Sequence, residues 1–199
     1  MLHRISYVMC GLLGLLLATP ALAAENGGRA LLLSANGGAF NALDNLNRDG
    51  SADFKSGFGL GGGLTYLMTE HFGVRGNFTF ARSQLQDAAA PILDRTEVDR
   101  YFYDADVQYR HPLRSGWTPY LFAGGGGVRI KPTSNNPSES AFSKGVGKAG
   151  LGLSYNVPNS RFAIGGEGTG RFYKWDRDGF DKNQLDALWS GGVSYRFNI

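Results

Sequence analysis

The sequence predicts an all-β fold, a closed eight-stranded antiparallel up-and-down barrel. Three observations carry this prediction. The 199 residues include 30 glycines, 13% aromatic and 42% hydrophobic residues, a composition too apolar for a disordered chain and too rich in glycine for a helical bundle. Apolar and polar residues alternate with a period of two along most of the chain, as they do in strands with two unlike faces. Short and long connections take turns between these strands, which indicates a series of hairpins.

The N-terminal residues 1–23 predict a cleaved signal peptide, which leaves residues 24–199 as a single barrel domain. A short positive start precedes an apolar stretch, and Ala21 and Ala23 supply the small residues of a cleavage site. The apolar stretch is shorter than the roughly 20 residues that a membrane-spanning helix needs. The only cysteine, Cys10, lies in this segment, so the exported chain must be held together by packing or by closing its sheet rather than by disulfides.

The alternation marks eight strands, of which the first, over residues 30–35, has the weakest pattern. In the other seven, one face carries large apolar side chains. In chain order these are Phe54, Phe58, Leu60, Leu64, Tyr66 and Met68; Val74, Phe78 and Phe80; Tyr101, Tyr103, Val107 and Tyr109; Tyr120, Phe122, Val128 and Ile130; Leu151, Leu153 and Tyr155; Phe162, Ile164 and Phe172; and Leu185, Trp189, Val193, Tyr195, Phe197 and Ile199. The opposite faces carry glycines, small polar residues and charged residues.

The connections between the strands predict the orientation of the barrel. The short ones cover residues 69–72, 111–116 and 158–160. The long ones are rich in Asn, Asp, Ser, Gly and Pro, which favour turns over sheet ladders. They cover residues 36–53, 83–99, 132–141 and 174–183. With an even number of strands both chain ends lie at the end of the short turns, so the four long loops project from the other end.

The distribution of bulky and charged side chains predicts which face of the sheet lies outside. The interior of an eight-stranded barrel is just wide enough for side chains, so the small and charged face must be the inner one. A water-soluble barrel, such as a lipocalin-like carrier, would have the reverse arrangement. The resulting outer belt greatly exceeds the few hundred Å² of apolar surface that soluble monomers expose. The sequence therefore predicts a transmembrane barrel, for which a mean hydropathy of -0.22 is no objection, because only alternate residues of its strands are apolar.

The charged residues on the inner face have both signs, and buried charges need partners. We expect them to form a neutralised network that fills and stiffens the lumen, with an ion pathway as the alternative. The members of the predicted network are Arg75, Asp104, Asp106, Arg110, Glu167, Arg171 and Arg196.

Four segments resemble the small outer-membrane β-barrel family of the OmpA transmembrane domain, OmpX and Ail. They are YLMTEHFGVR at residues 66–75, PYLFAGGG at 119–126, GLGLSY at 150–155 and VSYRF at 193–197, and the resemblance covers about the whole mature chain. The last segment is similar to the signal by which the outer-membrane insertion machinery recognises its clients, with Tyr195 and Phe197 as its aromatic residues. Such clients usually end on the aromatic residue, whereas two further residues follow here.

The resemblance implies an integral outer-membrane protein with outer-membrane lipids and lipopolysaccharide as neighbours. We expect a non-enzymatic barrel that displays extracellular loops for surface interaction or adhesion, with a possible host or surface ligand, and that contributes to envelope integrity. A small porin-like conduit for ions or small solutes is the alternative. A lipid A-modifying barrel enzyme is a minor alternative, because His71 and His111 lie in short turns, away from the outer leaflet where such an enzyme needs its base.

The sequence predicts no cofactor and no metal site. With no cysteine in the mature chain and no histidine cluster, a zinc site is unsupported. Asn45, Asn47, Asp49 and Gly50 resemble the start of a calcium-binding loop, but Ser56 stands where a bidentate Glu would be, so an ordinary turn is favoured. A net charge of +3 is no nucleic-acid footprint, and the long loops hold no basic cluster for heparin-like ligands.

Overall fold

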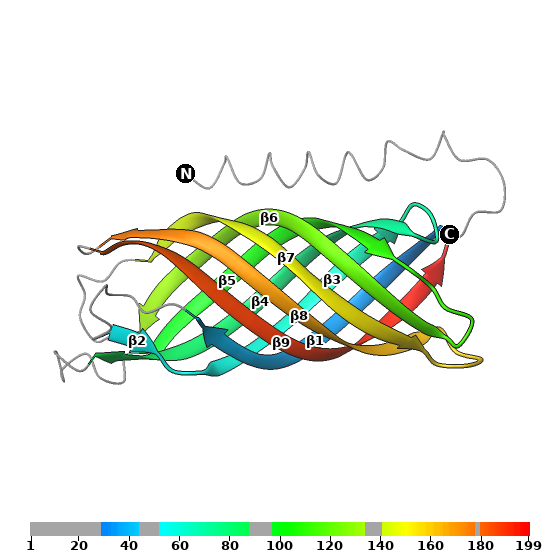
Figure 1. The fold of residues 1–199 in the computed structure, drawn as a ribbon, viewed down its shortest axis with the longest axis horizontal. Coiled ribbons are helices and arrows are strands. Elements are labelled where there is room, and N and C mark those ends of the chain that lie inside the picture. The colour runs from blue at the N-terminus through cyan, green and yellow to red at the C-terminus, as the bar shows by residue number, and fades with distance from the viewer. Residues whose placement is uncertain (1–28, 44–51, 88–96, 134–140, 178–179) are drawn as a thin grey trace.

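The computed structural model describes residues 29–43, 52–87, 97–133, 141–177 and 180–199 as one antiparallel sheet that closes on itself (Figure 1). The predicted signal peptide and the segment that resembles a calcium loop, Asn45 to Gly50, lie outside the described residues. Among the residues described, no helix is long and apolar enough to cross a membrane.

Eight long strands form the wall of the barrel, and a ninth, short strand lies in the first connection. The wall consists of β1 (Ala30–Ala42), β3 (Gly57–Leu67), β4 (Phe72–Asp87), β5 (Glu97–Arg110), β6 (Trp117–Thr133), β7 (Phe142–Asn156), β8 (Phe162–Arg177) and β9 (Phe180–Asn198). The short strand β2 (Ala52–Phe54) pairs with the far end of β4. Strand β1 pairs with β9 along its whole length, from Ala30 opposite Asn198 to Ala42 opposite Asp186, so every wall strand has a hydrogen-bonded neighbour on both sides.

The two ends of the barrel differ. We call the end with residues 68–71, 111–116 and 157–161, where β1 begins and β9 ends, the turn end, and the opposite end the loop end (Figure 1). At the loop end the strands run further than the sequence predicted. Only residues 178–179 separate β8 from β9, where a loop over residues 174–183 was expected.

The length of the strands explains this difference. Strand β9 has 19 residues and β8 has 16, whereas a strand crosses the hydrocarbon in about 9 to 11 residues. The excess projects at the loop end, where a strand needs no apolar outer face. Polar and small residues that signal turns in a sequence therefore continue the sheet ladder there.

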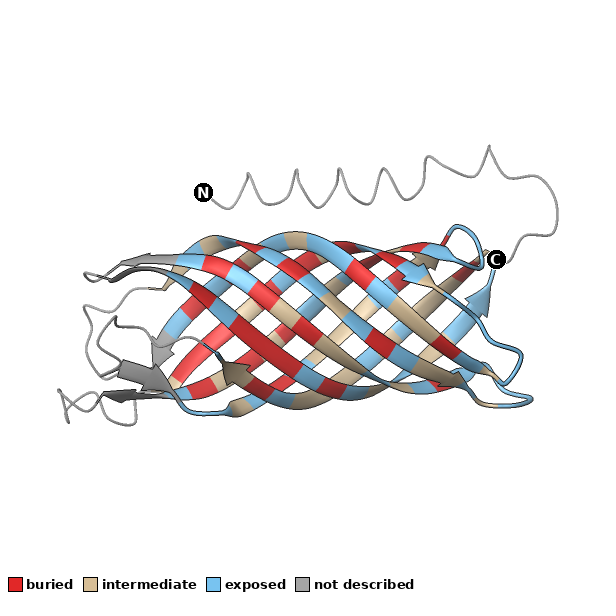
Figure 2. Ribbon diagram, viewed as in Figure 1, coloured by how far each residue is buried: buried red, intermediate tan, exposed pale blue. Residues whose placement is uncertain are grey.

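Buried and exposed residues alternate along each strand (Figure 2). The exposed large apolar side chains of the wall form the outer belt, as the sequence predicted for most strands. They include Leu60, Leu64, Phe78, Tyr103, Val107, Leu151, Leu153, Ile164, Phe172, Trp189 and Val193.

The predicted faces of strand β6 were wrong. Phe122, Val128 and Ile130, expected outside, are buried in the lumen, and Leu121 is exposed instead. Tyr120, also expected outside, faces the lumen, where it lines the cavity and donates to Glu167. The four consecutive glycines of this strand, residues 124–127, leave its middle without side chains, so size alternation does not reveal which face is which.

Aromatic rings pair at the turn end of the belt. Each pair joins residues that lie directly opposite each other on neighbouring strands, and such cross-strand contacts stabilise a sheet. The ring centroids are 5.2 Å apart in Phe72–Tyr109, 5.0 Å in Trp117–Tyr155 and 5.0 Å in Phe162–Tyr195. Such a row is typical of the aromatic girdle that an outer-membrane barrel places at the membrane interface.

If the belt faces hydrocarbon, a charge in its middle must cost far more than a charge at the turn end. We expect Leu151→Arg to lower the free energy of unfolding by about 2 to 4 kcal/mol, measured by urea unfolding in lipid bilayers. The matched control is Leu113→Arg, because Leu113 is 44% exposed but lies in a turn, whereas Leu151 is 61% exposed within the belt. Equal effects of the two substitutions would contradict a lipid-facing belt.

Candidate functional site in the barrel interior

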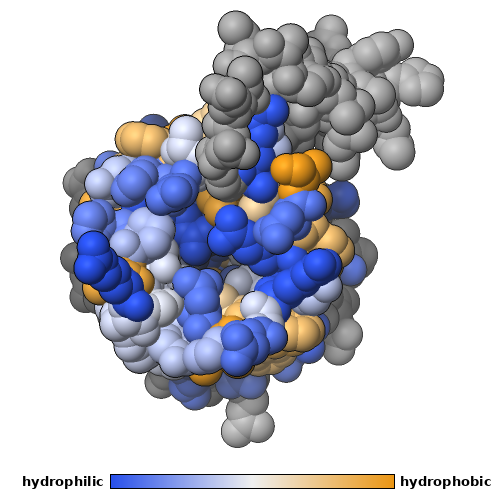
Figure 3. Space-filling model, turned by 90° about the vertical axis from the view of Figure 1, so that its right-hand side faces the viewer, coloured by the Kyte–Doolittle hydropathy of each residue, from blue (hydrophilic) through white to orange (hydrophobic). Residues whose placement is uncertain are grey.

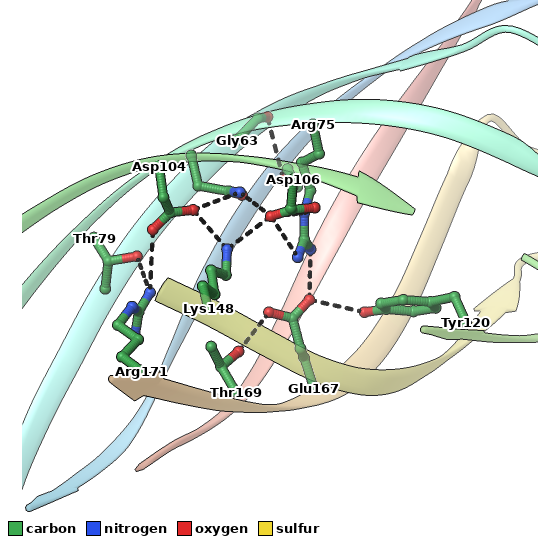
Figure 4. Close-up of polar contacts among 12 residues, drawn as sticks. Gly63, Arg75, Thr79, Asp104, Asp106, Tyr120, Lys148, Glu167, Thr169 and Arg171 are labelled. Carbon is green, nitrogen blue, oxygen red and sulfur yellow. Dashed lines mark hydrogen bonds and ion pairs between the residues drawn. The ribbon is translucent and has the colours of Figure 1, made fainter. Parts of the chain in front are cut away.

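The inward side chains form three layers along the barrel axis. Between the other two layers lies the charge cluster, defined as Arg75, Asp104, Asp106, Lys148, Glu167 and Arg171 (Figure 4). Nearer the loop end lies the apolar layer, defined as Phe40, Ala81, Val98, Phe102, Val128, Ile130, Val146, Tyr173 and Leu188. Toward the turn end the cluster borders a polar cavity. The period-two alternation of each strand sets these positions, because it turns every second side chain into the lumen.

Asp106 on β5 is the centre of the charge cluster. Its carboxylate accepts hydrogen bonds from Arg75 Nε at 3.1 Å and from Lys148 Nζ at 2.9 Å. Asn77 Nδ2 also donates to it, at 2.9 Å. The side chain of Asp106 is fully buried, so these three donors replace the water that its charge has lost.

Arg75 extends the cluster to the opposite wall. Its Nη1 donates to Glu167 Oε2 on β8, a residue that also accepts hydrogen bonds from the hydroxyl groups of Tyr120, at 3.2 Å, and Thr169, at 2.9 Å. The Arg75 guanidinium lies 4.3 Å from the ring centroid of Phe122. The link from β4 to β8 ties together walls that share no backbone hydrogen bonds.

Asp104 completes the cluster toward the loop end. Lys148 Nζ donates to its Oδ1 at 2.6 Å, and Arg171 Nη2 lies 3.8 Å from its Oδ2. Arg171 also donates to Thr79 Oγ1 at 3.0 Å. The cluster thus contains three cations and three carboxylates, and it is neutral as a unit.

The apolar layer closes the lumen above the cluster. Phe40, Phe102 and Ile130 each have 0% of their surface exposed. A second ion pair is embedded there, Arg100 with Asp186 at 3.9 Å, and Tyr173 donates its hydroxyl to Asp186 at 2.8 Å. The layer fills this part of the lumen with side chains.

The cavity lies on the turn-end side of the cluster and has a volume of about 70 Å³. That volume is enough for several water molecules. Its lining is polar and apolar in about equal parts, and its polar residues are Ser34, Asn36, Arg75, Tyr120, Ser154, Glu167, Ser190 and Ser194. Figure 3 views the turn end and shows hydrophilic side chains around and inside the opening.

The structure brings together five of the seven residues predicted for the network, namely Arg75, Asp104, Asp106, Glu167 and Arg171. It does not bring the other two to them. Arg110 and Arg196 stand at the turn end, and among the described residues no carboxylate lies within ion-pair distance of either.

The sequence analysis missed Lys148, which contacts both aspartates. A signal for it existed, because Lys148 has the opposite parity to Leu151 and Leu153, which were expected to face outward. The pairing of Arg100 with Asp186 carried no such signal, since it joins strands that are far apart in the chain.

No group of three or more His, Cys, Asp or Glu residues is arranged to hold a metal ion within the described part of the chain. His71 and His111 are exposed at the turn end, with ring centroids 6.2 Å apart.

Comparison with known proteins gives a family and a fold. The family model described as an outer membrane protein beta-barrel domain matches residues 10–197. No curated protein matches the chain.

Among solved structures, Neisserial surface protein A has a TM-score of 0.63 and 19% identity, over 87% of this chain and 100% of the other. OprG of Pseudomonas aeruginosa has a TM-score of 0.54 and 16% identity, over 87% and 98%. Ail of Yersinia pestis, in complex with the heparin analogue sucrose octasulfate, has a TM-score of 0.52 and 18% identity, over 86% and 100%. At these identities the likeness is one of fold.

The geometry of the cluster predicts that Lys148 is a structural cation. In Lys148→Met two buried aspartates lose a shared partner, so we expect the free energy of unfolding to fall by about 3 to 5 kcal/mol, measured in urea with lipid. Adding Asp104→Asn should recover part of this loss, because one of the uncompensated charges is removed. The control, Lys131→Met, changes an exposed lysine of β6 and should stay within roughly 0.5 kcal/mol of the wild type. A Lys148→Met protein as stable as the wild type would show that the cluster does not support the fold.

Proposed function

Because the chain belongs to the outer membrane protein β-barrel family, we propose that it is a closed, non-enzymatic barrel of the outer membrane that displays its loop end for surface interaction or adhesion. In this role the barrel also contributes to the integrity of the envelope. The lipids of the outer membrane, including lipopolysaccharide, are its expected surroundings.

The filled lumen is the observation that carries this proposal. Phe102, Val128 and Ile130 are fully buried in the apolar layer, and the charge cluster lies directly beneath them. An eight-stranded barrel has little room beyond its side chains, and an apolar constriction excludes ions by excluding water. Such a barrel is suited to anchoring and displaying its loop end in the membrane rather than to passing solutes.

The loop end supports the display role. The wall strands there are longer than a membrane crossing requires, so they carry the connections away from the lipid surface. Ail shares this fold and was solved with a heparin analogue. A different ligand chemistry is proposed for this chain, because its connections at residues 43–56, 88–96 and 134–141 hold no basic cluster.

The proposal includes how the chain reaches the outer membrane. Residues 1–23 would direct export and be removed, and the insertion machinery would recognise the end of β9. Tyr195 and Phe197 lie there with ring centroids 4.7 Å apart, and Phe197 is exposed on the outer face.

A small conduit is the second candidate function, and the polar cavity is the observation in its favour. The cavity reaches the charge cluster from the turn end, so it would form the inner half of a pathway. Conduction would then require both the cluster and the apolar layer to rearrange.

Planar bilayers distinguish the two functions. We expect the inserted wild-type protein to give no reproducible conductance steps, because the apolar layer keeps the lumen free of a continuous water column. Insertion is verified separately by the change in gel mobility between the folded and the heated protein. Large, discrete and repeatable steps would contradict the closed barrel and favour the conduit.

Cysteine labelling on intact cells tests which end is displayed. With a membrane-impermeant maleimide, Ser134→Cys should be labelled on whole cells, and Ser115→Cys only after the outer membrane is permeabilised. The wild-type protein should take no label in either condition, because its single cysteine, Cys10, lies in the predicted signal peptide. The reverse pattern for the two variants would show that the barrel is inverted, and labelling of the wild type would show that the signal peptide is retained.

A further inference from the structure

Two arginines lie on opposite walls of the barrel at its turn end. Arg110 is the last residue of β5 and shares the inward parity of Asp104 and Asp106, whereas Arg196 lies near the end of β9 and shares the inward parity of Ser190. Around the ring, β5 and β9 are four strands apart in either direction, so they form opposite walls. The two residues therefore stand at the same end of the barrel, on opposite walls and with inward parity.

The backbone holds both residues in place. The Arg110 N–H donates to the carbonyl oxygen of His71 at 2.7 Å, and the Arg196 N–H donates to that of Arg161 at 2.8 Å. Each arginine is thereby tied to a turn between two other strands. Arg110 is partly buried and Arg196 is exposed, and two like charges at one opening repel each other.

Nothing in the described part of the chain compensates these charges. The charge cluster is neutral as a unit, and Arg100 pairs with Asp186, so the deeper lumen holds matched charges. No described carboxylate lies within ion-pair distance of Arg110 or Arg196. We call the opening at the turn end, where Arg110 and Arg196 lie, the turn-end mouth. It is positively charged, whereas the lumen behind it is neutral.

The polar cavity lies further inward than the two arginines, and neither of them lines it. Ser194, two residues before Arg196 on β9, lines it, as do Ser34, Ser154 and Ser190. The hydroxyl oxygen of Ser190 and the amide oxygen of Asn36 are buried there without a hydrogen-bond partner among the described residues. Buried polar atoms without partners are rare in native proteins, so they indicate that the cavity receives water or a ligand.

We propose that the turn-end mouth binds a small oxyanion, a phosphate or a carboxylate group, between Arg110 and Arg196. The planar guanidinium group of an arginine presents paired N–H donors, which bind two oxygens of a carboxylate or a phosphate through two parallel hydrogen bonds. A bound anion also removes the repulsion between the two arginines. The source is either a soluble anion on the turn side of the membrane or the headgroup of an anionic lipid in the adjacent leaflet. This site is independent of the proposed function, which concerns the opposite end.

The first experiment measures binding of inorganic phosphate to the full chain in a zwitterionic detergent, against chloride at equal ionic strength. We expect phosphate to raise the unfolding midpoint of the wild type, as any ligand of the folded state does. Arg110→Gln and Arg196→Gln should each weaken phosphate binding by about tenfold or more, one pair of charge-assisted hydrogen bonds being lost. Their double variant should show no response.

The same variants are also measured without phosphate, where the proposal and a purely structural role predict different changes in the unfolding midpoint. Without the anion, neither Arg110→Gln nor Arg196→Gln should lower the unfolding midpoint, because each removes a like-charge repulsion rather than a stabilising contact. A purely structural role predicts a loss of stability in both. Should a glutamine variant fail to fold, Arg110→Lys keeps the charge without the paired donors and should bind phosphate more weakly than the wild type. The matched control is Arg114→Gln, an exposed arginine in the turn after β5, which should leave the phosphate response unchanged.

Vesicles distinguish the two sources. In phosphate-free buffer, the unfolding midpoint is compared between phosphatidylcholine vesicles with and without phosphatidylglycerol. A response to phosphate alone assigns the site to a soluble anion, and a response to phosphatidylglycerol alone, lost in the double variant, assigns it to a lipid headgroup. Absence of both responses in the wild type would overturn the proposal. Equal loss of response in Arg114→Gln would also overturn it, because general surface charge would then explain the binding.

Discussion

The pairing of β1 with β9 is the constraint on which the rest of the structure depends. Hydrocarbon offers no water to an unpaired backbone, and each unsatisfied group there costs several kcal/mol, so the sheet has to close. Closure with eight strands then sets the width of the lumen. That width explains why glycine, serine and threonine occupy much of the inner face at the turn end. It also explains why long charged side chains from opposite walls meet in the middle.

The contents of the lumen follow from this narrow width. Arg75 on β4 reaches Glu167 on β8, and Lys148 on β7 reaches two aspartates on β5, so the cluster braces strands that the sheet itself does not connect. A cluster of balanced charge has a strict geometry, because displacing any member leaves another charge unpaired in a low dielectric. The apolar layer above it tolerates more variation but excludes water. Together the two layers stiffen the wall and separate its ends.

Sequence patterns predicted most of the wall, because strands such as β5 and β8 alternate large apolar residues with small or charged residues. They failed at β6, where glycines at residues 124–127 remove the difference in side-chain size between the two faces. The aromatic residue Phe122 of this strand points into the lumen rather than outward. They also could not pair the charges. Arg75 and Glu167 are 92 residues apart, and their meeting depends on barrel width and strand stagger, which no local pattern records. Arg110 and Arg196 have the inward parity that the prediction required, but they lie nearer the turn end of the barrel axis than the charge cluster does.

The apolar layer has one further consequence, for how such a chain can change over generations. Phe102, Val128 and their neighbours lie between the loop end and the charge cluster, so a side chain changed at the loop end does not contact the cluster. The connections at the loop end can therefore change in sequence without touching the charge cluster. The opposite mouth can keep one chemistry throughout. A single fold can in this way combine connections of changeable sequence with an interior of fixed chemistry in one short chain.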